Sequence, residues 1–192
     1  MNDGHILVSN LMHGAIPQAI LFERRGGRMG YRNLGVVQNS SIAEPPELNS
    51  DLQSLTPDLE KILVEQGLFA DEAHAMVETW KDSWFEEGTR LLYLLPQSFV
   101  DNVLPLNIQP KAATTLRVFV GRMEVVTPAT EKAIETAFSS NDRATLAKYG
   151  RFLVPILQTM IARSTNRSRT NQLTTYLDSA YRDLATQLTA RN

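Results

Sequence analysis

The sequence predicts an α+β fold: a small antiparallel β part that forms a partial sandwich, then an α+β body, then a helical C-terminal third. Three observations lead to this prediction. Short apolar runs divided by turn residues occupy residues 4–37. Apolar residues at helical spacing fill most of residues 128–192. Between these regions, helix-like and strand-like segments follow one another, as in α+β chains.

The predicted β part covers residues 1–40. Apolar runs at 6–8, 16–23 and 29–37 predict three strands. Gly26-Gly27 separates the last two runs, and glycine supplies the positive φ that a hairpin turn needs. The sequence therefore predicts a hairpin with one further strand before it.

A linker is predicted over residues 41–55, which are rich in Pro, Ser and Asn, and an α+β body over 56–163. Thr56-Pro57 predicts the start of the first helix, because a hydroxyl can cap free amides and proline suits the first turn. The second predicted helix spans residues 70–85. One of its faces carries a row of apolar residues at three- and four-residue steps: Ala73, Met76, Val77, Trp80 and Trp84.

Strands are predicted at 89–95 and 115–126, with a short helix at 98–103 between them. Thr127-Pro128 repeats the helix-opening pair. Three helices are expected after it, at 129–139, 142–149 and 151–163.

Residues 164–192 are predicted to form a polar hinge and an amphipathic helix at 171–190. Its apolar stripe faces either the body of this chain or another chain. The residues that we expect to bind a partner come from this stripe and from the second helix: Trp80, Trp84, Leu177, Tyr181 and Leu184.

Composition excludes several kinds of chemistry. The chain has 192 residues and no cysteine, so disulfides, zinc–thiolate sites, iron–sulfur clusters and thiol nucleophiles are excluded. No apolar run reaches the roughly 18 residues of a membrane span, and no signal peptide is apparent at the start. These features predict a soluble chain, without fixing its compartment.

Charge is unevenly distributed although the net charge is −2. Residues 51–88 carry ten acidic and two basic side chains, whereas residues 128–192 carry nine basic and five acidic ones. The pattern indicates either electrostatic complementarity, within the fold or toward a partner, or an ordinary solvated helical face.

No catalytic motif is present. The chain lacks a serine-hydrolase elbow and both common glycine-rich phosphate loops, so we assign no catalytic residue and expect no cofactor. His74 lies one helical turn from Asp71 and from Glu78, and this trio is a candidate site for a divalent metal. The same spacing is typical of an exposed helical histidine with neighbouring carboxylates.

An arginine-rich hairpin is the other polar candidate. Arg24, Arg25, Arg28 and Arg32 alternate with glycine and Tyr31, which indicates an anion or nucleic-acid contact through phosphates and stacking. The acidic pI of about 5.9 counts against nucleic acid. The same pattern is also expected without a ligand, because a hairpin turn needs glycines and alternate arginines on a strand point outward.

Three sequence blocks resemble the C-terminal half of a group of uncharacterised bacterial proteins. They are AMVETWKDSWFEEGTRLLYLLP, RVFVGRMEVVTP and KYGRFLVPI, and the resemblance covers residues 5–163. Phe69 departs from it, because a helix-capping Thr or Ser is expected there. The resemblance brings no known activity.

The resemblance implies that the relatives are longer exported proteins with β structure upstream, which would place this chain in the periplasm or outside the cell. It further implies that this chain begins partway through a β-sandwich. We then expect residues 5–9 or 16–23 to form a strand edge that either pairs with another chain or is covered by the missing upstream sequence.

The leading functional hypothesis is a non-enzymatic structural or protein-interaction module, with a protein partner or a second copy bound through a β edge, an amphipathic helix or both. The alternatives are a hydrolase or metal-dependent enzyme built around His74, and an anion or nucleic-acid contact through the arginine hairpin.

Overall fold

The computed structural model describes residues 4–189, apart from the side chains of residue 184 and residues 187–189. It confirms the predicted α+β class. The chain forms two compact units, Met1–Met123 and Glu124–Asn192. Among the described residues, no helix has the length and hydropathy needed to span a membrane.

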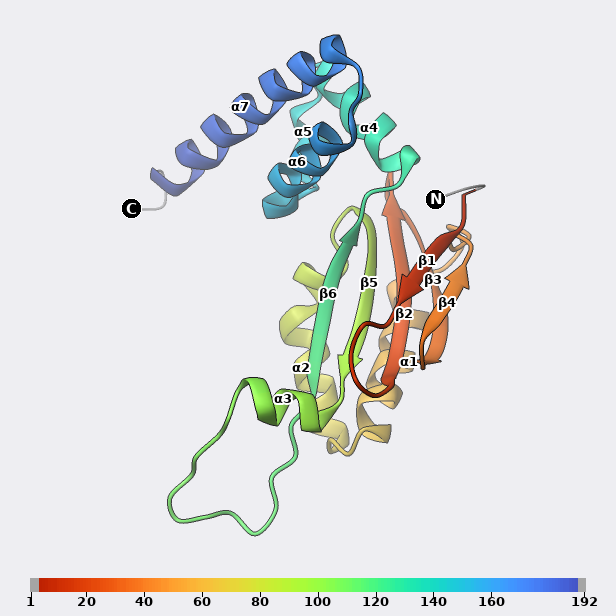
Figure 1. Ribbon diagram of the computed structural model, residues 1–192, viewed down its shortest axis with the longest axis vertical. Helices are drawn as coiled ribbons and strands as arrows, with labels where there is room; N and C mark the ends of the chain where they lie inside the picture. The colour runs from red at the N-terminus through yellow and green to blue at the C-terminus, as the bar shows by residue number, and fades with distance from the viewer. Residues whose placement is uncertain (1–3, 190–192) are drawn as a thin grey trace. The chain divides into compact units, whose positions relative to one another are not determined.

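A four-stranded sheet in the order β3-β2-β5-β6 forms the centre of the first unit (Figure 1). Strand β2 is antiparallel to both of its neighbours. The predicted hairpin is confirmed, since Gly26 and Gly27 turn between β2 and β3 with φ values of 59° and 81°. The strands are β2 (Ile16–Arg25), β3 (Arg28–Val37), β5 (Gly88–Leu95) and β6 (Phe119–Val125).

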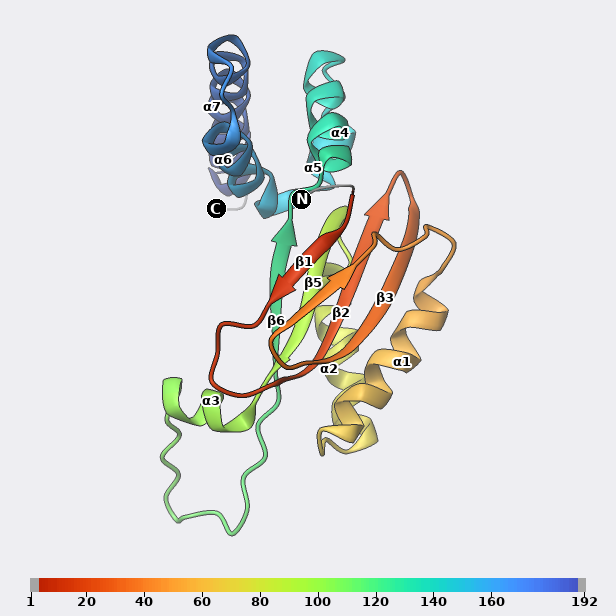
Figure 2. The ribbon, with the colours of Figure 1, turned by 45° about the vertical axis from the view of Figure 1, so that its right-hand side comes forward.

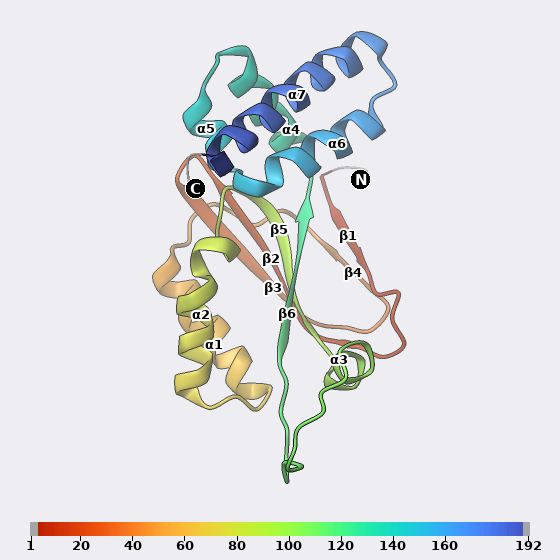
Figure 3. The ribbon, with the colours of Figure 1, turned by 90° about the vertical axis from the view of Figure 1, so that its left-hand side faces the viewer.

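Helices and a second, smaller sheet cover opposite faces of this sheet (Figures 2 and 3). Helices α1 (Leu52–Glu65) and α2 (Ala70–Trp84) lie on one face. On the other face, β1 (Ile6–Ser9) pairs antiparallel with β4 (Ser40–Ala43). Strand β4 falls in a segment that was predicted to have no regular structure. The strand was missed because it is only four residues long and its neighbours are rich in Pro, Ser and Asn.

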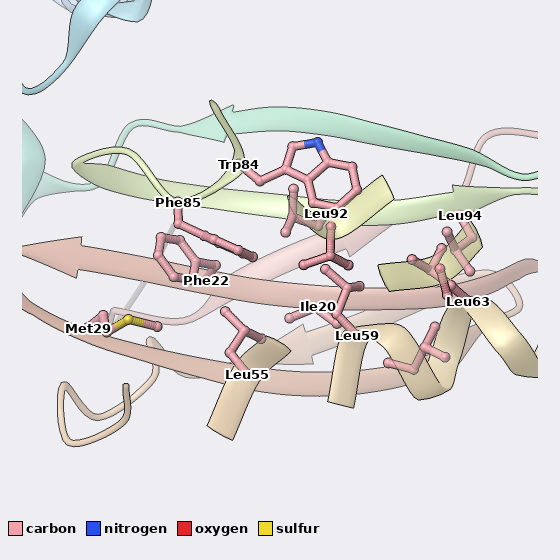
Figure 4. Packing of buried hydrophobic residues seen from close by; sticks show 13 residues of the cluster. Ile20, Phe22, Met29, Leu55, Leu59, Leu63, Trp84, Phe85, Leu92 and Leu94 are labelled. Carbon is pink, nitrogen blue, oxygen red and sulfur yellow. The ribbon is translucent and has the colours of Figure 1, made fainter. Parts of the chain in front are cut away.

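The core of the first unit lies between the sheet and the two helices (Figure 4). Alternate residues of the strands point to this side, and the helices contribute residues at three- and four-residue steps. Each fully buried leucine or phenylalanine stabilises the fold by about 1.5–3 kcal/mol. The largest contributors are Ile20, Phe22, Leu55, Leu59, Leu63, Trp84, Phe85, Leu92 and Leu94.

Helix α1 begins before the predicted Thr56-Pro57 pair, so that prediction is wrong. Asp51 caps the helix: its carboxylate accepts a hydrogen bond of 2.9 Å from the Ser54 amide. Pro57 therefore lies inside the helix. An aspartate five positions earlier in a polar stretch supplied a stronger cap than the threonine.

Helix α2 begins where predicted, directly after Phe69, the residue that departs from the resemblance. Phe69 has no side-chain oxygen to cap the helix. The carboxylate of Glu72 instead accepts a hydrogen bond of 2.9 Å from the Phe69 amide. This is the glutamate half of a capping box, which explains why the helix starts there without a serine or threonine.

Arg90 is fully buried beneath the end of α2. Its guanidinium donates hydrogen bonds of 2.8 Å to the Trp84 carbonyl and 2.6 Å to the Glu87 carbonyl, and it lies 5.4 Å from the centre of the Phe22 ring. One side chain of β5 therefore holds both ends of the α2–β5 connection. The bidentate geometry suits arginine, whose donors form a rigid fork.

The second unit consists of helices. A 3₁₀ turn, Gly150–Phe152, precedes α6, and the α-helices are α4 (Pro128–Ser139), α5 (Arg143–Ala147), α6 (Leu153–Arg163) and α7 (Arg167–Thr189). The predicted Thr127 cap is confirmed, because its hydroxyl accepts a hydrogen bond of 3.1 Å from the Thr130 amide. Buried residues from all four α-helices form its core, including Ile134, Leu146, Leu157, Met160 and Leu173.

Helix α7 starts four residues before the predicted position of 171. The Asn166 side chain accepts hydrogen bonds of 2.9 Å from the Ser168 amide and 3.1 Å from the Arg169 amide, so asparagine caps the helix within the predicted polar hinge. Arg169 then binds Glu131 and Glu135 of α4 at 2.7 Å and 2.9 Å. These ion pairs fix the first turns of α7 against α4.

Arg90→Met is expected to lower the free energy of unfolding by about 2–5 kcal/mol, because two buried carbonyls lose their donor. Arg90→Lys is expected to be nearly as destabilising, since an ammonium group lacks the planar fork. Arg32→Met is the matched control: that arginine is exposed, and a change below about 0.5 kcal/mol is expected. Urea unfolding followed by circular dichroism measures all three. Equal stability of the Arg90→Met and Arg32→Met variants would contradict this account.

Candidate interaction surface

The two edges of the four-stranded sheet differ in how they are covered. Residues 47–50 run along the outer edge of β3, where the Ser50 amide donates a hydrogen bond of 3.0 Å to the Met29 carbonyl. The Arg28 side chain donates another, of 3.2 Å, to the Leu48 carbonyl. The contact is so close at Gly30 that an added Cβ would lie 1.9 Å from the Glu47 carbonyl oxygen. Residues 47–50 therefore cover the first part of the β3 edge, around Met29 and Gly30.

The outer edge of β6 has no such cover in the first unit. No other described strand pairs with it, and the strand contains neither proline nor lysine, two residues that commonly protect an edge. Phe119 and Met123 lie on the face away from the helices and are 42% and 55% exposed. Arg122 points to the helix side, where it binds Glu86 at 2.9 Å. This edge therefore presents backbone and apolar side chains together.

A long loop leads into β6 from helix α3 (Gln97–Val103). Two hydrogen bonds hold its base: the Gln97 side chain donates to the Thr115 carbonyl at 3.0 Å, and Arg117 donates to the Leu104 carbonyl. Arg117 also binds Asp101 of α3 at 3.2 Å. The loop projects from the unit as an open curve (Figure 1). Long loops with anchored ends are often functional.

Exposed large hydrophobic side chains gather in the α3–loop–β6 segment, residues 97–123. Of the seventeen such side chains in the described part of the chain, eight lie in this segment: Phe99, Val103, Leu104, Leu106, Ile108, Leu116, Phe119 and Met123. Exposed apolar groups concentrated in one stretch mark a contact surface more often than scattered ones do. The β6 edge and the loop are therefore the candidate interaction surface.

The predicted open edges differ from the observed one. Residues 16–23 belong to β2, which pairs on both sides, so the prediction that they form an edge is wrong. Residues 6–9 form β1, which pairs with β4 and is four residues long. Short edge strands of this kind offer little backbone for pairing. The sequence did predict a strand at 115–126. Because side chains alternate along a strand, Phe119 was expected on the face of the strand opposite to the face that carries Val118 and Val120.

The two tryptophans predicted to share a partner-binding face are separated by the structure. Trp84 is buried in the core against Phe85, with ring centroids 6.4 Å apart. Trp80 is 49% exposed on the outer side of α2. The apolar stripe of α2 thus packs on the sheet and leaves Trp80 at its margin.

The terminal-helix residues also differ from one another. Leu177 is half-buried against the core of the second unit, and Leu173 and Ala180 beside it are buried. Tyr181 is 46% exposed, and its hydroxyl accepts a hydrogen bond of 3.2 Å from Gln158. The side chain of Leu184 lies outside the described part of the structure. The central part of the stripe therefore packs within its own unit.

The predicted metal trio is not assembled as a ligand set. His74 instead binds Glu60 of α1, with 2.8 Å between Nδ1 and the carboxylate oxygen. Asp71 and Glu78 are exposed, and no group of three His, Asp or Glu side chains in the described residues is arranged to hold a metal ion. The hydrogen bond that His74 donates to the Glu60 carboxylate raises the pKa of His74, the charge of Glu60 adds to this, and the nearby charges of Glu78 and Asp71 add smaller effects.

The four arginines of the hairpin do not form one surface. Arg24 lies on the helix side and donates a hydrogen bond of 3.1 Å to the Phe85 carbonyl. Arg25 pairs with the buried Glu23, and Arg28 binds the Leu48 carbonyl. Three of the four guanidinium groups thus serve the fold, and Arg32 is exposed. An anion could therefore not bind all four guanidinium groups at one place.

A groove of about 490 Å³ lies within the second unit, with mainly apolar lining from Phe138, Leu146, Leu153, Val154 and Ala180. Arg143 and Asp183 on its rim bind each other at 2.8 Å. Catalytic pockets combine an apolar lining with convergent polar groups that orient a substrate. Here two of the polar side chains that line the groove, Arg143 and Asp183, bind each other, and Arg151 and Thr186 line it as well.

Comparisons with known proteins add no assignment: no family model, curated protein or solved structure matches the chain. The resemblance to exported bacterial proteins accordingly stays a prediction.

Replacing Gly30 by alanine is expected to detach residues 47–50 from β3, because the added methyl group and the Glu47 carbonyl cannot occupy the same space. We expect faster hydrogen exchange at the Ser50 amide and a lower melting temperature. Gly27→Ala would not serve as the control, since Gly27 has a positive φ. Arg28→Ala removes a single hydrogen bond on the same edge and should have a smaller effect. Unchanged exchange at Ser50 in Gly30→Ala would show that the contact is not close.

His74 should titrate above its ordinary pKa of 6.5 in the folded protein. Because folding raises this pKa, the stabilisation from the His74–Glu60 pair is fully present below about pH 6.5 and is lost as pH rises through the raised value. NMR titration of the imidazole measures it, and Glu60→Gln should return the pKa toward 6.5. A His74 pKa that is unaffected by Glu60→Gln would contradict the assignment.

Proposed function

We propose that this chain is a non-enzymatic protein-interaction module whose β6 edge accepts an extended segment of another chain. The single observation that carries the proposal is the outer edge of β6: no other described strand pairs with it, whereas residues 47–50 cover the first part of the β3 edge. Addition of a strand to an open edge is a common way to bind a peptide segment. Backbone hydrogen bonds would supply affinity, and Phe119 and Met123 would supply side-chain contacts.

The loop supports this proposal because it leads directly into β6 and carries further exposed apolar groups. Leu104, Leu106 and Ile108 are 49%, 55% and 43% exposed. Leu104 lies at the base of the loop, where its carbonyl accepts a hydrogen bond from Arg117, so a partner segment lying along β6 would meet it near the beginning of the strand. Apolar anchors of this kind provide most of the binding energy in many interfaces.

An edge contact has better support than a contact through the terminal helix. The predicted apolar stripe of α7 is buried at Leu173 and Ala180 within the second unit. A helix whose apolar face is already packed has little left to present to another chain.

The proposal is tested with the full chain immobilised and exposed to an extract of the source cells. Any captured protein is then purified and its affinity measured by isothermal titration calorimetry. The double variant Phe119→Lys/Met123→Lys should lose at least about tenfold in affinity, because lysines on an edge oppose strand pairing. Hydrogen exchange at the amides of residues 119–123 should slow when the partner binds.

The matched control is Leu7→Lys/Ile42→Lys. Leu7 and Ile42 are an exposed cross-strand pair on the small sheet, 61% and 70% exposed. Affinity should survive this change. If affinity instead falls in the control and survives in the β6 variant, or if exchange in β6 stays unchanged on binding, the proposed edge contact is rejected.

A further inference from the structure

We infer that the segment paired with β6 is β6 of a second copy of this chain, antiparallel and centred on Gly121. This inference rests on the proposed function and names its partner. Pairing of this kind produces an isologous dimer with one continuous sheet across the two-fold axis. Whether the two edges fit together is decided by which residues face one another.

The edge is complementary to itself in this register. In an antiparallel pair, residues placed symmetrically about the centre lie opposite each other on the same face. Centring on Gly121 places Phe119 of one copy opposite Met123 of the other, and the reverse contact forms on the other side of the axis. These are the most exposed apolar side chains of the strand. Methionine sulfur against an aromatic ring is a favourable contact.

Residues on the opposite face are compatible with the same register. It places Arg122 opposite Val120 and Glu124 opposite Val118, so no like charges meet. Arg122 keeps its pairing with Glu86 in its own copy, because that ion pair lies toward α2 and away from the edge.

Neighbouring registers fit less well. Centring on Arg122 would place two arginines directly opposite each other, and centring on Glu124 would do the same with two glutamates; like charges in that position destabilise a strand pair. Centring on Met123 would place Phe119 opposite Thr127, beyond the end of the strand. Centring on Val120 would place Phe119 opposite Gly121 and Met123 opposite Arg117, so neither apolar side chain would gain an apolar partner.

Gly121 is suited to the centre of such an interface. The Tyr93 ring of β5 lies across it, where an added Cβ would be 2.4 Å from the ring. The ring fills the space between Phe119 and Met123 on the same face of the sheet. In the dimer, the two tyrosines would flank the axis and continue one apolar strip across both copies.

The absence of cysteine from this chain allows a direct test of the register. Two single variants, Phe119→Cys and Met123→Cys, are purified separately and then mixed under mild oxidation. The mixture should form a disulfide-linked dimer, because residues 119 and 123 of different copies face each other. Each variant alone should cross-link at least about tenfold more slowly, since like positions would be four residues, roughly 13 Å, apart along the strand.

Light scattering provides the second measurement. The wild-type chain should have twice its monomer mass of 21.5 kDa at micromolar concentrations. Phe119→Lys/Met123→Lys should be a monomer with unchanged circular dichroism, and Leu7→Lys/Ile42→Lys should remain a dimer. A monomeric wild type, or a dimer that survives the β6 lysines and whose mixed cysteine variants do not cross-link, overturns the inference.

The two proposals fail in distinguishable ways. A monomeric wild type whose β6 edge still binds a captured protein rejects the second copy and retains the interaction module. A wild-type dimer linked in the mixed cysteine experiment supports both. Capture that depends on Leu7 and Ile42, and not on Phe119 and Met123, rejects the β6 edge contact whatever the oligomeric state.

Discussion

The buried guanidinium of Arg90 is the interaction on which the first unit depends. It joins the last turn of α2 to β5 through the Trp84 and Glu87 carbonyls. Glu87, held by this contact, in turn accepts a hydrogen bond of 2.6 Å from the Gly26 amide at the hairpin turn. One buried cation thus fixes the helical layer, β5 and the β2–β3 hairpin together. Without it, the backbone of the α2–β5 connection would be buried without donors, which is costly in a low-dielectric core.

That connection also determines what the edge of the sheet can do. Glu86 lies within this connection and binds Arg122 of β6 at 2.9 Å. The positive charge of Arg122, which could otherwise protect the edge of the sheet, is therefore held on the side of α2. The outward face of β6 is left with Phe119, Gly121 and Met123, and Tyr93 supports it from β5. At the opposite edge, by contrast, Gly30 permits a close contact that covers the first part of β3. In the four-stranded sheet, β6 is therefore the strand whose outer edge has no cover within the first unit.

Much of this fold could be predicted from the sequence, because the signals were local. The hairpin at Gly26-Gly27, α2, β5 and the Thr127 cap follow from turn chemistry, apolar spacing and capping. The start of α1 was missed because Asp51, in a polar stretch, caps the helix in place of the predicted Thr56-Pro57 pair. The candidate surface was harder to predict, because the order of the strands decides whether a given strand lies at the edge or in the centre of the sheet. Residues 16–23 and 115–126 both gave a strand signal, but only the sheet topology shows that the first is central and the second is at the edge.

The same reasoning explains why charged and aromatic residues were poor guides to function in this chain. Arg24, Arg90 and Trp84 each attract attention in a sequence, and each is engaged by the fold. Phe119 and Met123 carry no motif, yet they lie beside free backbone. An open edge flanked by apolar side chains is unfavourable in water unless something covers it, because it exposes both apolar area and a template for pairing. The apolar side chains that the fold leaves exposed are therefore a better guide to the proposed interface than conspicuous charges or rings, and Phe119 and Met123 of β6 are two of them.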